Sequence, residues 1–179
     1  MTPREIEEYR ALRATIRERG SLRIVLFLVG VIAWAAATIA TAALAALPIA
    51  TLLPLLVLAS AFEALYAVHT GVERIGRYLQ VFYSDEGTRE WERTTMAYGR
   101  DFRAGGPDAL FSTYFYFATI LNFVPVLLAE PVRLEVSVVG GVHLLFMVRV
   151  FAAHRTSGHQ RTLDLERFQR LKQDKPTAS

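Results

Sequence analysis

The stretch Ile24–Phe62, IVLFLVGVIAWAAATIATAALAALPIATLLPLLVLASAF, decides the fold because its 39 residues include no Asp, Glu, Lys or Arg. A soluble core helix seldom needs more than about 20 such residues, so a run of this length is typical of membrane-spanning protein. An unbroken helix over the run would be about 58 Å long, close to twice the thickness of the hydrocarbon core. The chain is therefore expected to turn back inside this stretch.

Two prolines mark the place of the turn. Pro48 and Pro54 lack the amide donor that a helix interior requires, although proline is tolerated in a first helical turn. The sequence predicts a first span over Ile24–Leu47, a tight turn at Pro48–Thr51 and a second span directly afterwards. Thr51 is a suitable N-cap for that second helix. These elements form the first predicted hairpin.

A second hairpin is predicted further along the chain. Ala109–Ala129 is free of charged residues and ends before Pro131. The next uncharged run, Val136–Val148, is too short to span alone. It reaches a spanning length as Arg133–Phe151 if its two flanking arginines extend toward opposite interfaces. The short connection between the two runs favours a hairpin.

The distribution of positive charge predicts the orientation. Of 20 Lys and Arg residues, six lie in 1–23, six in 69–108 and six in 152–179. Positively charged segments stay cytoplasmic, so both termini and the central loop are expected inside a multi-pass cell-membrane protein. The predicted fold class is an all-α integral membrane protein with four transmembrane helices as two hairpins. Its segments are a cytoplasmic amphipathic helix at 1–23, the first hairpin at 24–70, a cytoplasmic helical extension and loop at 71–108, the second hairpin at 109–151, and a cytoplasmic tail at 152–179.

Amphipathic patterns predict helices outside the membrane. Thr2-Pro3-Arg4-Glu5 is a capping box with proline at the first helical position, and Gly20-Ser21 is a candidate bend before the membrane. The second span continues past the interface with an apolar stripe, and Thr88–Arg103 is a further candidate helix. These helices either pack together as a cap or lie on the headgroups, or they bind a cytoplasmic protein partner; the first interpretation is favoured because charged helical faces are usually solvated.

Composition argues against several function classes. The absence of cysteine excludes disulfides, thiolate metal sites and cysteine nucleophiles. The net charge of +3 is explained by cytoplasmic flanks, and no basic block suggests a nucleic-acid partner. The chain has no GxGxxG, Walker, GxSxG or HExxH motif, so no enzymatic activity is expected.

The histidines give weak metal and haem signals. His69 and Glu73 share a helix face, as half of a metal site does, but a polar interfacial face with a Glu73–Arg77 pair is the favoured interpretation. His69 and His143 are the conceivable axial ligands of a haem. Their estimated depths differ by about 15 Å, whereas the two ligands of one iron lie nearly level. No metal and no cofactor are therefore expected.

Four polar residues are predicted within the membrane. Glu63 lies deep in its span and is expected to point into the bundle, since lipid offers a carboxylate no partner. Arg149 is its expected partner, because their depths differ by about 3 Å. His143 is the alternative partner, about 6 Å shallower, and Asn122 is placed about a turn further out. This set either ties helices together or forms an ion or proton path.

Small residues predict close helix packing. Ala33, Ala36, Ala37 and Ala40 follow small-xxx-small spacing, and Gly140-Gly141 opens the fourth span. The resulting hypothesis is a self-associating membrane scaffold or signalling module with a helical cytoplasmic cap, whose partners are the lipid bilayer and further copies of itself. The alternative is an ion or small-solute transporter or channel that uses the residues around Glu63. A haem-binding redox subunit is the third hypothesis.

Overall fold

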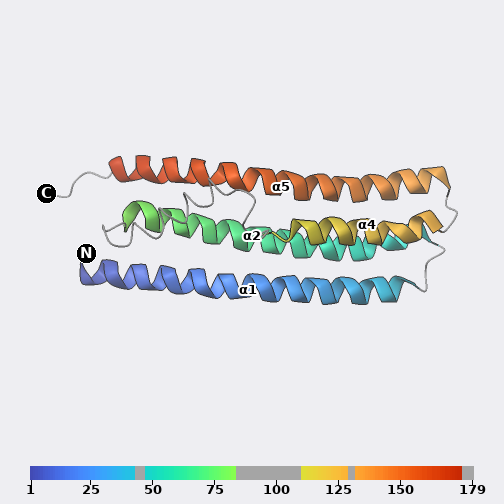
Figure 1. Cartoon of the computed structure of the whole chain (residues 1–179), viewed down its shortest axis with the longest axis horizontal. Helices are drawn as coiled ribbons and strands as arrows, with labels where there is room; N and C mark the ends of the chain where they lie inside the picture. The colour runs from blue at the N-terminus through green and yellow to red at the C-terminus, as the bar shows by residue number, and fades with distance from the viewer. Residues whose placement is uncertain (43–46, 84–109, 129–131, 175–179) are drawn as a thin grey trace.

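The computed structural model describes residues 1–42, 47–83, 110–128 and 132–174, and these are helical, with no strand among them (Figure 1). The elements in chain order are α1 (Pro3–Ala42), the 3₁₀ turn η1 (Pro48–Thr51), α2 (Leu52–Phe82), α4 (Ser112–Leu128) and α5 (Arg133–Gln173). The predicted all-helical class is confirmed. The candidate helix Thr88–Arg103 lies outside the described residues.

Three of the described helices are long and apolar enough to cross a membrane. They are Pro3–Ala42, Pro48–Phe82 and Arg133–Ser157. The fourth apolar helix, α4, is shorter, with 17 residues. The long apolar helices fit the predicted association with a membrane.

The helices lie side by side with their axes nearly aligned (Figure 1). α1 and α2 run antiparallel, as do α4 and α5, and the start of α1 and the end of α5 lie at the same end of the bundle. α2 contacts each of the other helices that the structure describes. α4 covers the half of the bundle away from the start of α1, so at the other half the described helices are α1, α2 and α5.

The amphipathic helices that the sequence predicts outside the membrane are continuous with the apolar helices. α1 is one helix of 40 residues, and the predicted bend at Gly20-Ser21 is absent. α5 likewise continues for 41 residues, well past the end of its apolar part. A single glycine raises the cost of a helix by only about 1 kcal/mol, which packing against α2 offsets. The predicted boundaries at 23 and 151 are therefore changes in polarity within a helix and not breaks in it.

The start of α1 matches the sequence pattern. The Thr2 amide donates to Glu5 Oε2 at 2.7 Å, and the Glu5 amide donates to Thr2 Oγ1 at 3.3 Å. These reciprocal bonds satisfy two amides that no helical carbonyl can reach. The predicted capping box is confirmed.

The first hairpin turns where the prolines predict it. η1 covers Pro48–Thr51 and α2 begins at Leu52. Thr51 occupies the N-cap position, but its hydroxyl donates to the Pro48 carbonyl at 2.8 Å and caps no amide. Its backbone is helical, with φ −67° and ψ −15°, whereas a capping side chain needs an extended backbone. The predicted capping role of Thr51 is wrong for this reason.

The core is centred on the inward face of α2. Phe62 packs edge-to-face on Phe115 of α4 at 5.2 Å and on Phe146 of α5 at 6.0 Å between ring centroids. α1 approaches α2 through Gly30, where an added Cβ would lie 2.6 Å from the Ala61 Cβ. Aromatic contacts therefore join α2 to α4 and α5, and a close backbone approach joins it to α1.

Near the termini, α1 and α2 meet through tyrosines. Tyr78 donates to Glu8 Oε1 at 3.0 Å, and the rings of Tyr9 and Tyr83 lie 6.0 Å apart. Burial, followed by the neighbouring Glu8 carboxylate, raises the pKa of the Tyr83 phenol well above its usual range. Burial and the neighbouring carboxylate therefore both keep the Tyr83 phenol in its protonated, uncharged form.

α5 covers the same end of α2. Phe168 packs on Tyr78 with ring centroids 5.8 Å apart, and Lys172 Nζ donates to the Val81 carbonyl at 2.6 Å. A lysine at this place satisfies a carbonyl that the last turn of α2 leaves without a helical partner. The amphipathic segments thus pack on one another as a three-helix cap, formed by the ends of α1, α2 and α5 near the termini.

Candidate functional site

The four polar residues predicted within the membrane form two separate pairs. Arg149 Nη2 donates to Glu63 Oε2 at 2.8 Å, which confirms the partner predicted from depth. The Asn122 Nδ2 and His143 Nε2 atoms lie 3.0 Å apart. The predicted offset of about a turn between Asn122 and His143 is therefore wrong. Along the helix axes, Asn122 lies about 9 Å from the end of α4, and His143 lies about 15 Å from the start of α5. Because the two side chains are level, α5 must begin about one helical turn beyond the end of α4.

The Glu63–Arg149 pair lies on the outside of the bundle. The two side chains are 49% and 40% exposed, so the expectation that Glu63 points into the bundle is wrong. The inward face of α2 is occupied by Leu58, Phe62 and Leu65, and Glu63 follows Phe62 by about 100° around the helix. Apolar packing therefore turns Glu63 outward.

Aromatic rings support the arginine of this pair. The Arg149 Cζ atom lies 4.9 Å from the Tyr66 ring centroid and 5.9 Å from that of Phe62. A guanidinium over an aromatic face is stabilised by about 0.5–2 kcal/mol, and more where water is excluded. Arg149 thus has favourable contacts besides Glu63, whereas Arg149 is the single partner of the Glu63 carboxylate among the described residues.

Polar side chains continue from this pair toward the three-helix cap along the line where α2 meets α5. The Tyr66 hydroxyl lies 3.4 Å from Thr156 Oγ1 and donates to Gln160 Oε1 at 3.4 Å. One further turn along α2 is Thr70, and then Glu73. We name this set the polar stripe: Glu63, Arg149, Tyr66, Thr156, Gln160, Thr70 and Glu73.

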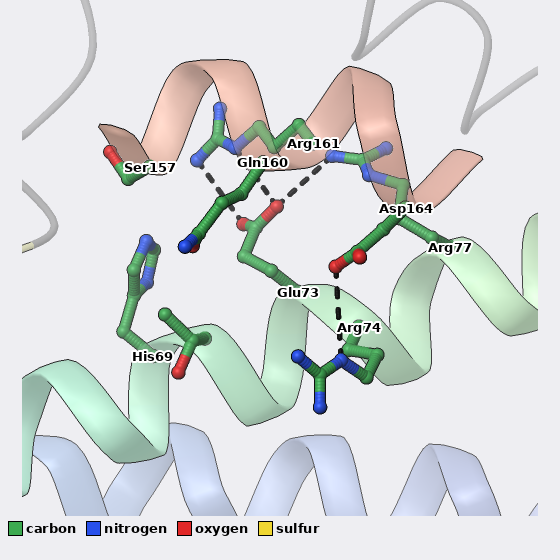
Figure 2. Close-up of a pocket in the computed structure, with 9 residues that line it drawn as sticks. His69, Glu73, Arg74, Arg77, Ser157, Gln160, Arg161 and Asp164 are labelled. Atoms are coloured by element: carbon green, nitrogen blue, oxygen red, sulfur yellow. Dashed lines mark hydrogen bonds and ion pairs between the residues drawn. The ribbon is translucent and has the colours of Figure 1, made fainter. Parts of the chain in front are cut away.

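Glu73 ends the polar stripe in a cluster of charges (Figure 2). Arg77 Nη2 donates to it at 3.0 Å, which confirms the predicted Glu73–Arg77 pair. Arg161 of α5 contacts both carboxylate oxygens, with Nε at 3.0 Å from one and Nη2 at 3.2 Å from the other. Asp164 lies 3.8 Å from Arg74 beside them. Such a two-point arginine contact holds the carboxylate in a fixed orientation.

His69 is buried at the same place. It lines a cavity of about 20 Å³ between α2 and α5, together with Ser157 and Gln160 (Figure 2). This volume holds about one water molecule. No group of three His, Asp or Glu side chains among the described residues is arranged to hold a metal ion. The two arginines on Glu73 make this position unfavourable for a cation.

Sequence reasoning missed Arg161 and Asp164. Arg161 lies 88 residues from Glu73 along the chain, so no local spacing connects them. The feature of the sequence that could have identified these two residues is the length of the helical pattern that begins at Arg133 and continues into the tail. A fourth helix that continues straight into the tail places 155–165 beside 69–77, because α2 and α5 run in the same direction.

The second pair belongs to a buried network that joins three elements. Asn122 Nδ2 donates to the Thr51 carbonyl at 2.8 Å and to His143 Nε2 at 3.0 Å. His143 Nδ1 lies 2.8 Å from the Val139 carbonyl, which can only accept. The proton is therefore on Nδ1, and Nε2 is the acceptor for the Asn122 amide. Both imidazole nitrogens are thus engaged in holding η1, α4 and α5 together.

Replacing Asn122 by Leu is expected to lower the free energy of unfolding by about 1–2 kcal/mol, because the Thr51 carbonyl and His143 Nε2 both lose their donor. Ile120→Leu, on the exposed face of the same helix, is the matched control and is expected to leave stability unchanged. Unfolding in bicelles by steric trapping measures both variants. Equal stability of the two would show that the network contributes nothing.

Apolar rings separate the two pairs. Phe146 lies between His143 and Arg149 along α5 and packs on Phe62 and Phe115 in the core. The Glu63–Arg149 pair and the Asn122–His143 network are therefore separate polar contacts. Compared with protein-family models, with curated proteins and with solved structures, the chain gives no match.

Proposed function

We propose that this chain is a small multi-pass membrane protein that associates with copies of itself and presents its three-helix cap on the cytoplasmic side, as a scaffold or signalling module. Four spans with both termini cytoplasmic agree with the positive charge at 1–23, 69–108 and 152–179. The exposed surface of the cap is where a cytoplasmic protein partner would bind.

The arrangement of the helices supports α4 as the fourth span. α4 is about 26 Å long, near the thickness of the hydrocarbon core. The start of α1 and the end of α5 lie at one end of the bundle, which requires an even number of crossings between them (Figure 1). With α1, α2 and α5 as three crossings, α4 supplies the fourth.

The observation that carries self-association is the exposure of the Glu63–Arg149 pair. Glu63 is about 17 Å from the start of α2, well inside a helix that is apolar enough to span. Charged groups at such a depth face a protein interior or a water-filled space, because lipid solvates them poorly. The single chain leaves both side chains nearly half exposed. A second copy of the chain, packed on this face, would bury the two side chains.

The exposed face of α2 suits such a contact. It consists of Leu53, Leu56, Ser60, Glu63 and Ala67. The small side chains of Ser60 and Ala67 lie about one turn on either side of Glu63, so another helix can approach the ion pair closely. Small residues beside a polar group are the combination that favours helix association in lipid.

Disulfide cross-linking tests this contact, since the chain has no cysteine of its own. Ser60→Cys in native membranes is expected to form a covalent dimer on oxidation. Leu144→Cys is the matched control, exposed at a similar depth but about 140° around α5 from Arg149, and should remain monomeric. Equal cross-linking of both variants would argue for random collision, and no cross-linking of Ser60→Cys would argue against this interface.

A transporter or channel is the second candidate, and the polar stripe is the observation that favours it. It leads from Glu63 past Tyr66 and Thr70 to Glu73, which gives a polar line from the cap end to mid-span. Beyond Glu63 the exposed face of α2 becomes apolar at Leu56. Flux of protons or cations into liposomes containing the purified protein would favour this candidate over a scaffold.

A further inference from the structure

A second cavity lies at the end of the bundle opposite the termini. It has a volume of about 330 Å³ and is bounded by α1, η1, α2 and α4. Most of its wall is apolar, and its lining includes Thr38, Thr41, Leu47, Pro54, Asn122 and Leu128. The volume is in the range of small-molecule sites, which are largely apolar with a few placed polar groups.

The threonine hydroxyls of this cavity already donate elsewhere. Thr38 Oγ1 donates to the Trp34 carbonyl and Thr41 Oγ1 to the Ala37 carbonyl, both at 2.8 Å. Thr51 Oγ1 donates to the Pro48 carbonyl. A hydroxyl has one proton and two lone pairs, so each of these oxygens can still accept a hydrogen bond but has no proton to offer.

Asn122 gives the cavity a stronger acceptor. Its side chain is only 3% exposed, and its Nδ2 protons go to the Thr51 carbonyl and to His143. Among the described residues no group donates a hydrogen bond to the Asn122 Oδ1 atom. Because Asn122 lies on the wall of a largely apolar cavity, a donor supplied by a ligand would be favourable at this oxygen. The polar side chains of the described lining residues can thus accept a hydrogen bond from a ligand but have no proton left to donate.

We propose that this cavity binds an apolar small molecule that carries one hydroxyl or N–H donor, with the donor on Asn122 Oδ1 and the apolar body along Pro54, Leu47 and Leu128. The cavity accommodates about a dozen methylene-sized groups. A ketone, ester or ether of the same size brings another acceptor and leaves the amide oxygen without a partner. The site therefore selects aliphatic alcohols over ethers of equal length.

Photolabelling tests the proposal on the full-length protein in lipid nanodiscs. A decanol that carries a diazirine is the probe, and decanol and its isomer nonyl methyl ether, an ether of equal length, are the competitors. We expect labelled peptides from 38–54 and 122–128, and about tenfold more effective competition by decanol, which corresponds to about 1.4 kcal/mol. Equal competition by the two compounds would overturn the donor requirement and leave an apolar space that lipid chains fill.

Two variants test the location. Thr41→Phe fills the cavity from α1 and is expected to abolish labelling. Ile39→Phe adds similar bulk at a lipid-facing position, 75% exposed, and is expected to label like the unchanged protein. Labelling that persists in a folded Thr41→Phe variant would place the probe elsewhere. If Thr41→Phe does not fold, the comparison of alcohol and ether on the unchanged protein still decides the proposal.

Discussion

Arg149→Gln is expected to lower the free energy of unfolding by about 2–3 kcal/mol, the approximate cost of an unpaired carboxylate within a membrane helix. The reason is that Glu63 loses its partner at 2.8 Å. Glu63→Gln is expected to cost less, because Arg149 keeps its contacts with the Tyr66 and Phe62 rings and its long side chain can reach toward the three-helix cap. The two single variants should therefore differ in a defined direction.

The double variant tests whether the unpaired charge causes the loss of stability in Arg149→Gln. With Glu63→Gln and Arg149→Gln combined, no charge is left unpaired, so much of the stability should return. Steric trapping in bicelles gives the four free energies of the cycle. Arg155→Gln is the matched control on the same helix, because Arg155 is exposed and lies over the Phe151 ring. Additive single effects would show that the pair does not stabilise the fold.

The same variants separate the two proposed functions. In a self-associating module, Glu63→Gln should weaken the Ser60→Cys cross-link and change no flux. In a transporter, Glu63→Gln should leave folding intact and abolish a measured flux of protons or cations. If stability, cross-linking and flux all remain unchanged, Glu63 is a carboxylate at the lipid surface that reaches the cytoplasmic side, and both proposals fail at this residue.

Features set by one segment could be predicted from the sequence. The capping box at Thr2–Glu5 and the turn at Pro48–Thr51 depend on residues within a few positions of one another, so local chemistry is sufficient. The Glu63–Arg149 pair could be predicted because α2 and α5 run in the same direction and each rises by a fixed distance per residue. Depth arithmetic thus identifies partners on different helices.

Features that depend on rotation or on register between helices could not be predicted. Depth does not specify the direction in which Glu63 points, and the packing of Phe62 settles it. The level of Asn122 relative to His143 depends on where α5 begins beyond the end of α4. Arg161 reaches Glu73 only because α5 continues straight past the apolar segment. Each of these requires the positions of several helices at once.

Gly30→Leu is expected to lower the free energy of unfolding by about 3 kcal/mol, near the upper end of the usual cost of overpacking. A Cβ at Gly30 would lie 2.6 Å from the Ala61 Cβ, so α1 and α2 must move apart. Ala61 lies beside Phe62, so this separation disturbs the packing that turns Glu63 outward. Gly30→Ala should be less severe, at about 1–2 kcal/mol.

An exchange of the two side chains tests this explanation directly. Gly30→Ala combined with Ala61→Gly moves the methyl group from one helix to the other and should restore most of the stability that Gly30→Ala loses. Gly141→Ala is the matched control, since nothing lies within 4 Å of its added Cβ, and it should be neutral or slightly stabilising. Thermal unfolding in detergent measures all of these variants. If the exchange fails to restore stability while Gly141→Ala is neutral, the contact of Gly30 with Ala61 is not what sets the distance between α1 and α2.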